Sequence, residues 1–305
     1  MINHNIEYSV ILPCYNEAES LAELTGRLVK VVSSFKTSYE LIYVDDGSTD
    51  NTVEIFKEIK RQYGDVVRML KLSRNFGHHF AITAGLDNCK GNIVIIMDTD
   101  LQMLPEEIPR LVNKLKEGYD LVYGYWENRN DAFLKKLLSK SFNYIINKMT
   151  RLPIPLNSYI FRAIDRKCVD SLKDLREQSR FITGLFSWIG FKQTGVSVAL
   201  GKRKHGSPKY NFLKSLELAL RTIASFTHFP LQLLFYLGIM TIFAGILFSF
   251  GLIYDFINIK NGTLINLIIY FQGMNLFIFG LLGEYIGRIL YETQKRPLYI
   301  ISEEI

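Results

Sequence analysis

Two aspartates one residue apart directly follow an apolar run. Asp98 and Asp100 come after residues 93–97, a β-branched stretch without helix caps that begins after the turn residues 90–92. This pattern predicts a buried strand of a sheet that is covered on both faces. Ligands of such sheets lie beyond the carboxyl ends of the strands, where two carboxylates suit Mg²⁺ or Mn²⁺. Taken alone, an Asp-x-Asp pair is more typical of two solvated acids in a turn than of a metal site.

A second acidic strand end lies upstream and favours a binding site. Residues 40–44 read as a strand that ends in Asp45 and Asp46, followed by Gly47. Neighbouring parallel strands end at the same edge, so the two acidic pairs are expected to lie side by side. The upstream pair could accept hydrogen bonds from a uracil or a ribose, and Gly47 allows backbone to come close to a ligand. The downstream pair, Asp98 and Asp100, could hold a metal against a diphosphate.

A phosphorylated ligand also calls for cations from later loops. For each candidate taken singly, a solvated surface charge is the favoured interpretation. The candidates are Arg129, Arg162, Arg180, Arg203 and Lys209. Three histidines, at positions 78, 79 and 205, could assist a proton transfer, but we expect structural or surface roles for them.

Strands and helices alternate along the first part of the chain. Strands are expected at residues 8–13, 40–44, 66–72, 93–97 and 120–123, and helices follow the first four of them. Asn16 is expected to cap the first helix and Glu19 to lie in its first turn. Short connections between alternating elements predict βαβ units and a mostly parallel sheet.

Composition excludes some classes of protein. The 305 residues carry 36 Lys+Arg against 30 Asp+Glu, a net charge of +6 that is not gathered into the basic runs of a nucleic-acid-binding protein. It suits an anionic membrane surface or phosphorylated substrates. The three cysteines have neither metal spacing nor a disulfide pattern, which indicates a reducing compartment, and the N-terminal residues do not resemble a signal peptide.

The second part of the chain predicts membrane association. We expect a cytoplasmic domain over residues 1–210, a juxtamembrane amphipathic helix at 211–228, transmembrane helices at 229–254 and 264–283, and a cytoplasmic tail at 284–305. Basic residues before the first span and after the second place both ends in the cytoplasm. A further amphipathic helix, at residues 132–150, either packs on the sheet or lies on anionic lipid. Glycines at positions 238, 245, 273 and 280 hint at close helix packing and a possible homo-oligomer.

Several motifs together resemble family 2 glycosyltransferases of the GT-A fold. These are Tyr15-Asn16-Glu17, Asp45-Asp46-Gly47-Ser48, Ser73-Arg74-Asn75-Phe76-Gly77 and Asp98-Thr99-Asp100-Leu101-Gln102. Residues 180–184, 188–191, 206–210, 283–288 and 295–299 resemble the polyprenyl-phosphate glycosyltransferases, which include dolichyl-phosphate mannose synthases and the bactoprenol glucosyltransferase type with two C-terminal membrane helices. The resemblance covers essentially the whole chain.

The resemblance implies a Rossmann-like GT-A domain and an inverting, metal-dependent transfer. The donor would be a nucleotide sugar, with UDP favoured, and the acceptor undecaprenyl phosphate at the cytoplasmic face of a bacterial inner membrane. The implied nucleotide-sugar ligands are Pro13, Tyr15, Glu17, Asp45, Asp46 and Asp98, and the metal ligands are Asp98 and Asp100. Catalytic roles fall to Asp100, Gln102 and Arg162, and phosphate or acceptor contacts to Arg129, Arg180, Arg203 and Lys209.

Three positions depart from the subfamily's pattern. Met103 and Ile160 stand where it usually has Asp, and Trp126 stands where an Arg is expected. A phosphate acceptor is already anionic at pH 7 and hardly needs a base, so these changes are compatible with a lipid phosphate. Two alternatives stay open. One is transfer to a hydroxyl of a lipid-linked saccharide of the cell envelope or O-antigen, and the other is a non-catalytic membrane scaffold with a decayed transferase domain.

Overall fold

The computed structural model describes residues 6–126, 155, 158–201, 234, 236–240 and 261–305. The chain divides into two compact units. One comprises Met1–Asn147, Leu152–Lys209 and Pro297–Ile305, and the other comprises Lys148–Arg151 and Tyr210–Arg296. The end of the chain therefore belongs to the same unit as its beginning.

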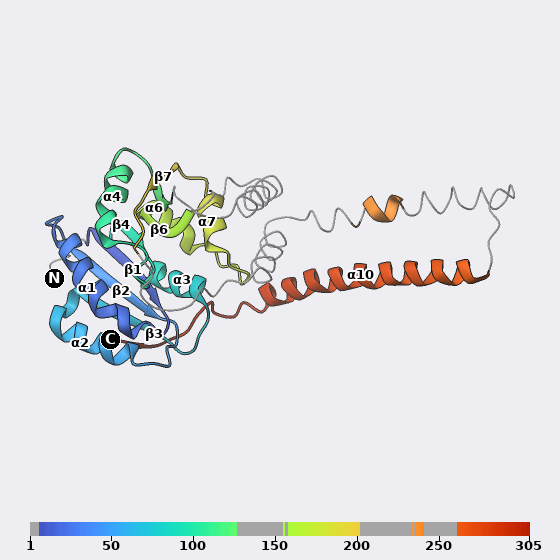
Figure 1. Cartoon of the computed structure of the whole chain (residues 1–305), viewed down its shortest axis with the longest axis horizontal. Coiled ribbons are helices and arrows are strands. Elements are labelled where there is room, and N and C mark those ends of the chain that lie inside the picture. Colours follow the sequence, from blue (N-terminus) through green and yellow to red (C-terminus); the bar gives the residue numbers. More distant parts are fainter. Residues whose placement is uncertain (1–5, 127–154, 156–157, 202–233, 235, 241–260) are drawn as a thin grey trace. The chain divides into compact units, whose positions relative to one another are not determined.

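The first unit is built on a mixed sheet, which has eight strands among the described residues, in the order β7-β5-β6-β4-β1-β2-β3-β8 (Figure 1). They are β1 (Tyr8–Cys14), β2 (Tyr39–Asp45), β3 (Val67–Leu72), β4 (Ile93–Ile96), β5 (Leu121–Tyr125), β6 (Ser158–Asp165), β7 (Gln193–Ser197) and β8 (Ile301–Glu304). The neighbours β4-β1-β2-β3 are parallel, as are β5 and β7. β6 is antiparallel to β4 and β5, and β8 is antiparallel to β3. The prediction of a mostly parallel sheet is confirmed, because β1–β5 and β7 run in one direction and, among the described strands, β6 and β8 run in the opposite one.

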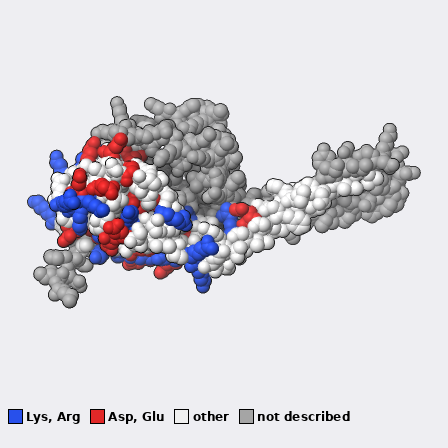
Figure 2. All heavy atoms as spheres, turned by 90° about the horizontal axis from the view of Figure 1, so that it is seen from below, with Lys and Arg blue, Asp and Glu red and all other residues white. Residues whose placement is uncertain are grey.

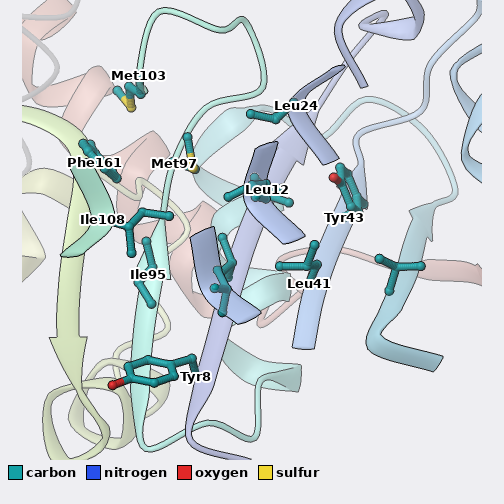
Figure 3. Close-up of a cluster of buried hydrophobic side chains, with 14 of the residues drawn as sticks. Tyr8, Leu12, Leu24, Leu41, Tyr43, Ile95, Met97, Met103, Ile108 and Phe161 are labelled. Carbon is teal, nitrogen blue, oxygen red and sulfur yellow. The ribbon is translucent and has the colours of Figure 1, made fainter. Parts of the chain in front are cut away.

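Helices cover both faces of this sheet. They are α1 (Ala18–Ser33), α2 (Thr52–Tyr63), α3 (His78–Asn88), α4 (Ile108–Lys116), α6 (Arg166–Lys173) and α7 (Ile182–Trp188), with short 3₁₀ turns at Gly64–Val66 and Pro105–Glu107. The helical spacing of Leu21, Leu24 and Leu28 places them on one buried face of α1. Figure 3 shows Leu24 in the same cluster as Leu12 of β1, whose side chain points to this side of the sheet.

The other face of β1 packs against α3. Ile11 points there because successive residues of a strand alternate between faces. Gly85 of α3 lies so close that a Cβ on it would be 2.3 Å from Ile11 Cγ2. The glycine thus lets α3 approach the centre of the sheet, and this approach brings the first residue of α3 to the end of the parallel strands.

The C-terminal tail returns to the sheet as its last strand. Ile305 exchanges two backbone hydrogen bonds with Met69 of β3, at 2.9 and 3.0 Å. Leu298 is buried. The tail covers an edge of β3 that would otherwise present unpaired backbone groups. The predicted tail at residues 284–305 did not include this strand.

The second unit holds α10 (Asn261–Thr293). Its stretch Phe271–Thr293 is long and apolar enough to cross a membrane, and among the described residues it alone has these properties. Figure 2 shows its surface as uncharged over most of the length, with charged side chains toward one end. The expected span at 264–283 lies within α10. Almost all of the expected span at 229–254, and the amphipathic helices at 132–150 and 211–228, fall outside the described residues, so a second span stays a prediction.

The contact between the 88–92 turn and β1 gives a test of the fold. A Cβ on Gly91 would lie 2.5 Å from the backbone nitrogen of Ser9, which is fixed within the sheet. We expect Gly91→Ala to lower the free energy of unfolding by about 1–3 kcal/mol, the usual cost of overpacking a filled site. Urea unfolding of the full-length protein, followed by the fluorescence of its two tryptophans, measures this.

A matched control is Gly26→Ala in α1. There a Cβ would meet only the Tyr63 hydroxyl, at 3.6 Å, which is an ordinary contact. This change should raise stability by about 0.5–1 kcal/mol because alanine loses less backbone entropy in a helix. Equal effects of the two changes would contradict the packing described for Gly91.

Candidate functional site

Three loops meet where β1, β2 and β4 end. Cys14 and Asp45 are paired in register at the ends of β1 and β2. The chain after β4 stays beside β1, because Met97 N donates to Ile11 O at 3.1 Å and Thr99 Oγ1 donates to Pro13 O at 3.2 Å. The two acidic pairs therefore follow strands on either side of β1, at the same edge of the sheet, as the sequence predicted.

Asp46 holds a fourth segment at this edge, the loop formed by residues 73–77. Its Oδ1 accepts a hydrogen bond from Phe76 N at 2.8 Å, and its Oδ2 accepts one from Gly77 N at 2.9 Å. Burial raises the pKa of Asp46, and these two bonds partly offset the effect. Asp46 therefore organises the protein's own backbone, and its predicted contact with a nucleotide stays a prediction.

Gly47 makes the approach of that loop possible. Its φ is +72°, which favours glycine, and a Cβ would lie 2.6 Å from the carbonyl carbon of Arg74. The sequence predicted that Gly47 admits backbone close to a ligand. In the structure the backbone that comes close is that of Arg74 and Asn75.

Asp45 is differently placed although it is the adjacent residue. Its side chain is fully buried, and Oδ1 accepts a hydrogen bond from Ser48 N at 3.1 Å. Oδ2 is buried with no hydrogen-bond partner among the described residues. Burial raises the pKa of Asp45 against the effect of Ser48. The predicted contact of Asp45 with a nucleotide stays a prediction.

The loop after β1 is joined to the loop after β2 through Asn16. This residue has a φ of +57°, its N–H donates to Ser48 Oγ at 2.9 Å, and its Oδ1 accepts from Thr49 N at 2.8 Å. The prediction that Asn16 caps α1 is wrong. The N-cap position is Glu17, whose side chain makes no capping bond, and the Asn16 amide instead satisfies the neighbouring loop. Glu19 does lie in the first turn of α1.

The other predicted nucleotide ligands of this loop lie at the same edge. Pro13 is buried within β1, and Tyr15 is exposed. Glu17 N donates to Thr52 Oγ1 at 3.0 Å, and its carboxylate accepts from Ser20 Oγ at 3.2 Å. The structure brings these residues together with Asp45, and their contacts with a nucleotide stay predictions.

Asp98 is hydrogen-bonded to the first residue of α3. Its Oδ1 lies 2.7 Å from His78 Nε2, and both side chains are partly exposed. Burial acts to lower the pKa of His78, but the bond to Asp98 and the charges of Asp46 and Asp100 outweigh it, so the pKa is raised. The neighbouring His79 is different, because burial lowers its pKa to about 4 and it is neutral at pH 7.

Asp100 lies in a tight turn. Its Oδ1 accepts a hydrogen bond from Gln102 N at 3.1 Å, and Leu101 between them has a φ of +61°. Gln102 is also held through its carbonyl, which accepts from Gly201 N at 2.9 Å. The turn is therefore held by one hydrogen bond within it and by one from Gly201. These bonds fix the position of the Asp100 carboxylate after β4.

The donor set at this edge suits a hard divalent cation. No group of three or more His, Cys, Asp or Glu side chains in the described part of the chain could hold a metal ion. Asp98 and Asp100 supply carboxylate oxygens, the ligands that Mg²⁺ and Mn²⁺ prefer. Cations of this kind commonly bind through one or two carboxylates and complete their shell with substrate phosphates and water.

Arg162 lies inside the sheet. It stands in β6 opposite Ile96, and its side chain is fully buried. The guanidinium carbon is 4.4 Å from the centre of the Phe186 ring and 5.7 Å from that of Tyr123, as in cation–π contacts. Burial lowers the pKa of Arg162 to about 9, so the side chain is still charged at pH 7. Its catalytic role stays a prediction.

Arg180 contacts the end of a helix. The side chain is buried, and it donates to the carbonyl of Leu172 in the last turn of α6 and to that of Leu175, two residues beyond the helix. A cation satisfies the last carbonyls of a helix and interacts favourably with its dipole. Its predicted phosphate contact stays a prediction. Arg129, Arg203 and Lys209 lie outside the described residues.

Two of the three departures from the subfamily's pattern, Met103 and Ile160, are apolar and packed, and the third, Trp126, is half-buried directly after β5. Met103 is 4% exposed and belongs to the core cluster, where Figure 3 shows it near Phe161. Ile160 packs against the same cluster. Neither position offers a carboxylate or room for a solvated one.

The sequence did not reveal three features of the site. They are the His78–Asp98 bond, the use of Asp46 by the 73–77 backbone, and the tail beside β3. One signal for the first two features was available in the sequence. Gly77 and His78 follow the predicted strand at 66–72, and in βαβ units the N-terminus of the next helix lies near the end of the preceding strand. Nothing in the tail's four-residue strand distinguishes it from a solvated terminus.

The sequence is similar to those of known proteins of one family. Residues 9–173 match the family described as glycosyl transferase family 2. The uncharacterized glycosyltransferase YkcC of Bacillus subtilis strain 168 is 40% identical and aligns over 99% of this chain and 95% of its own length. An undecaprenyl-phosphate 4-deoxy-4-formamido-L-arabinose transferase of Proteus mirabilis strain HI4320 is 38% identical, over 97% of this chain and 93% of that protein.

A match among solved structures has low sequence identity. The crystal structure of S. aureus TarS 1-349 in complex with UDP-GlcNAc aligns with a TM-score of 0.49 and 17% identity, over 72% of this chain and 66% of that one. The family match covers more than half of the chain, and the two relatives align over nearly all of it. The chain therefore belongs to the family 2 glycosyltransferases.

Proposed function

We propose that this enzyme transfers a sugar from a nucleotide sugar, with UDP as the favoured nucleotide, to a polyprenyl phosphate at the cytoplasmic face of the membrane. The observation that carries the donor half is Oδ2 of Asp45, which is buried and has no hydrogen-bond partner in the part of the chain that the structure describes, at the edge that also holds Asp98 and Asp100. A buried acceptor without a donor is costly, and a uracil N–H or a ribose hydroxyl would satisfy it. Pro13, Tyr15 and Glu17 would contact the same nucleotide.

The acceptor half is supported by the relatives and by α10. The name of the P. mirabilis relative specifies undecaprenyl phosphate as the acceptor of that protein. The apolar stretch Phe271–Thr293 gives this chain a segment suited to the bilayer in which such a lipid lies. A multi-pass arrangement in a bacterial inner membrane belongs to the same proposal.

The reaction we propose is a single displacement. An oxygen of the lipid phosphate attacks the anomeric carbon from the face opposite the nucleotide. The bond from that carbon to the diphosphate oxygen breaks, and its electron pair leaves with the nucleoside diphosphate, so the configuration inverts. The attacking phosphate is an anion at neutral pH, so no side chain has to remove a proton. The apolar Ile160 and Met103 fit this requirement.

The chain's own residues position the donor. Asp98 and Asp100 would hold Mg²⁺ or Mn²⁺ beside the diphosphate. When bound, such a cation acts as a Lewis acid that neutralises the charge on the leaving group. His78 fixes the direction of the Asp98 carboxylate, and the Gln102 N–H fixes that of Asp100. Gln102 and Arg162 would act near the sugar, and Arg129, Arg180, Arg203 and Lys209 would meet phosphates.

The transfer itself is tested with Asp100→Asn. Full-length protein in detergent is incubated with undecaprenyl phosphate, Mn²⁺ or Mg²⁺ and a panel of nucleotide sugars, and lipid products are read by mass spectrometry. We expect a sugar-phosphate-lipid product from one donor and a loss of at least about 100-fold in kcat with Asp100→Asn, the usual effect of removing one group that stabilises developing charge. The matched control is Asp65→Asn, which removes an exposed acid that pairs with Lys60.

The outcomes separate the alternatives. Product formed only on a lipid-linked saccharide would replace the phosphate acceptor by a hydroxyl. Nucleotide binding without product on either acceptor would favour the non-catalytic scaffold. Equal activity of Asp100→Asn and Asp65→Asn would contradict the metal site.

Asp45→Asn tests the donor half separately. The amide keeps Oδ1 for Ser48 but replaces the open acceptor by a donor, so we expect the dissociation constant for UDP to rise at least about 5-fold. Burial raises the folded-state pKa of Asp45 above its value in the unfolded chain, so its ionised form destabilises the folded protein at neutral pH. Asp45→Asn should therefore leave the unfolding midpoint at pH 7 unchanged or higher.

The same variant has a defined pH dependence. As the pH falls through the raised pKa, wild-type Asp45 takes up a proton in the folded state and its destabilising charge disappears. The stability difference between Asp45→Asn and wild type should then shrink. Unfolding midpoints at several pH values and calorimetric titration with UDP give both quantities. Lower stability with unchanged UDP affinity would show that Asp45 is structural.

A further inference from the structure

We call the edge where β1, β2 and β4 end, with Asp45, Asp46, Asp98 and Asp100, the donor edge. The C-terminal tail contacts the segment, residues 73–88, that lies along this edge. After β3 ends at Leu72, the chain continues through the 73–77 loop and into α3. The tail bonds to the start of this segment, because Ser73 N donates to Ile300 O at 2.9 Å. It also bonds near its end, because Tyr299 Oη donates to Asp87 Oδ2 at 2.8 Å, and Asp87 is the penultimate residue of α3.

The Tyr299–Asp87 hydrogen bond is supported by its surroundings. Burial and the Asp87 charge both raise the pKa of Tyr299, so the phenol keeps its proton and donates. The same Asp87 oxygen accepts from Arg176 Nη1 at 2.8 Å. Hydrogen bonds to a charged acceptor are stronger than neutral ones. The tail therefore restrains the C-terminal end of α3.

Between these two fixed ends the segment contacts the donor edge. The loop gives its Phe76 and Gly77 N–H groups to Asp46, and α3 begins with His78, which bonds to Asp98. The side chains of residues 73–75 are exposed, and the backbone of Arg74 and Asn75 lies against Gly47. A helix of this length is a rigid rod of about 16 Å, so a shift at its C-terminal end moves its N-terminal residue as well.

We propose that the tail, residues 297–305, is a positioning element for the donor site, and that Tyr299 is its main contact. The tail holds the 73–77 loop and α3 so that Asp46 and Asp98 keep their directions. This inference rests on the proposed function for its catalytic consequence. A purely structural tail, which only covers the edge of β3, would change stability and leave the donor edge unaltered.

The test uses Tyr299→Phe in the full-length protein. This change removes one hydroxyl and leaves the ring in place. Its matched control is Ser302→Ala, which removes a hydroxyl of the same tail that donates to Lys71 O in β3 and does not reach α3. Hydrogen–deuterium exchange at Phe76, Gly77 and His78 reports the loop directly, without substrate or metal.

We expect these amides to exchange faster in Tyr299→Phe and at the wild-type rate in Ser302→Ala. In Tyr299→Phe we expect a rise of about 3- to 10-fold in the dissociation constant for UDP in the presence of Mn²⁺ and in KM for the nucleotide sugar. This is the effect of one lost hydrogen bond. The change in kcat should be smaller, since the chemical groups are untouched. A double-mutant cycle with Asp87→Asn should show that the two changes are coupled in UDP affinity.

Two results would overturn the proposal. One is a lower unfolding midpoint in Tyr299→Phe with unchanged exchange at residues 76–78. The other is equal effects of Tyr299→Phe and Ser302→Ala on exchange and on UDP affinity. A wild-type protein that binds UDP but transfers no sugar to polyprenyl phosphate contradicts the proposed function alone, because exchange and UDP affinity still decide the role of the tail.

Discussion

Asp46 is a buried carboxylate at the end of a central strand, and its need for hydrogen bonds constrains the whole donor edge. Two backbone N–H groups from the 73–77 loop meet that need. Charges that are buried without such partners are strongly unfavourable, so the loop cannot leave without a large cost in stability. Gly47, with its positive φ and missing side chain, gives the loop the space to come that close. The first turn of α3, and with it His78, is placed by the same bonds.

The four acids of this edge differ in their hydrogen bonds. Asp46 binds backbone N–H groups, whereas Oδ2 of Asp45 beside it is buried without a hydrogen-bond partner among the described residues. Asp98 and Asp100 follow β4 and are each held by one hydrogen bond, from a histidine and from a backbone N–H. Carboxylates held in fixed directions before the ligand arrives need little reorganisation during the reaction, which is the general basis of electrostatic catalysis.

Much of this edge could be predicted from the sequence, because the central strands are local features. The β-branched run before Asp98 and the strand before Asp45 predicted β4, β2 and their common edge. The contact of Arg180 with the end of α6 could not be predicted. A sequence shows only an arginine, and it does not distinguish one that bonds to helix carbonyls from one that binds a phosphate. Asn16 failed as a cap because its amide bonds to a loop more than thirty residues away. β6, β7 and β8 were not predicted, because polar residues or glycine interrupt the apolar pattern of β6 and β7 and because β8 is a four-residue segment that pairs with β3 far away in the sequence.

A structure of the full-length protein with a UDP-sugar and Mn²⁺ bound is the most direct test of the central claim. The account predicts the uracil or ribose beside Asp45, with a donor group within hydrogen-bond distance of Oδ2, and the diphosphate and metal at Asp98 and Asp100. It also predicts that Asp46 keeps its bonds to the 73–77 loop in the complex. A nucleotide bound at another edge of the sheet, or a metal that contacts neither Asp98 nor Asp100, would contradict it.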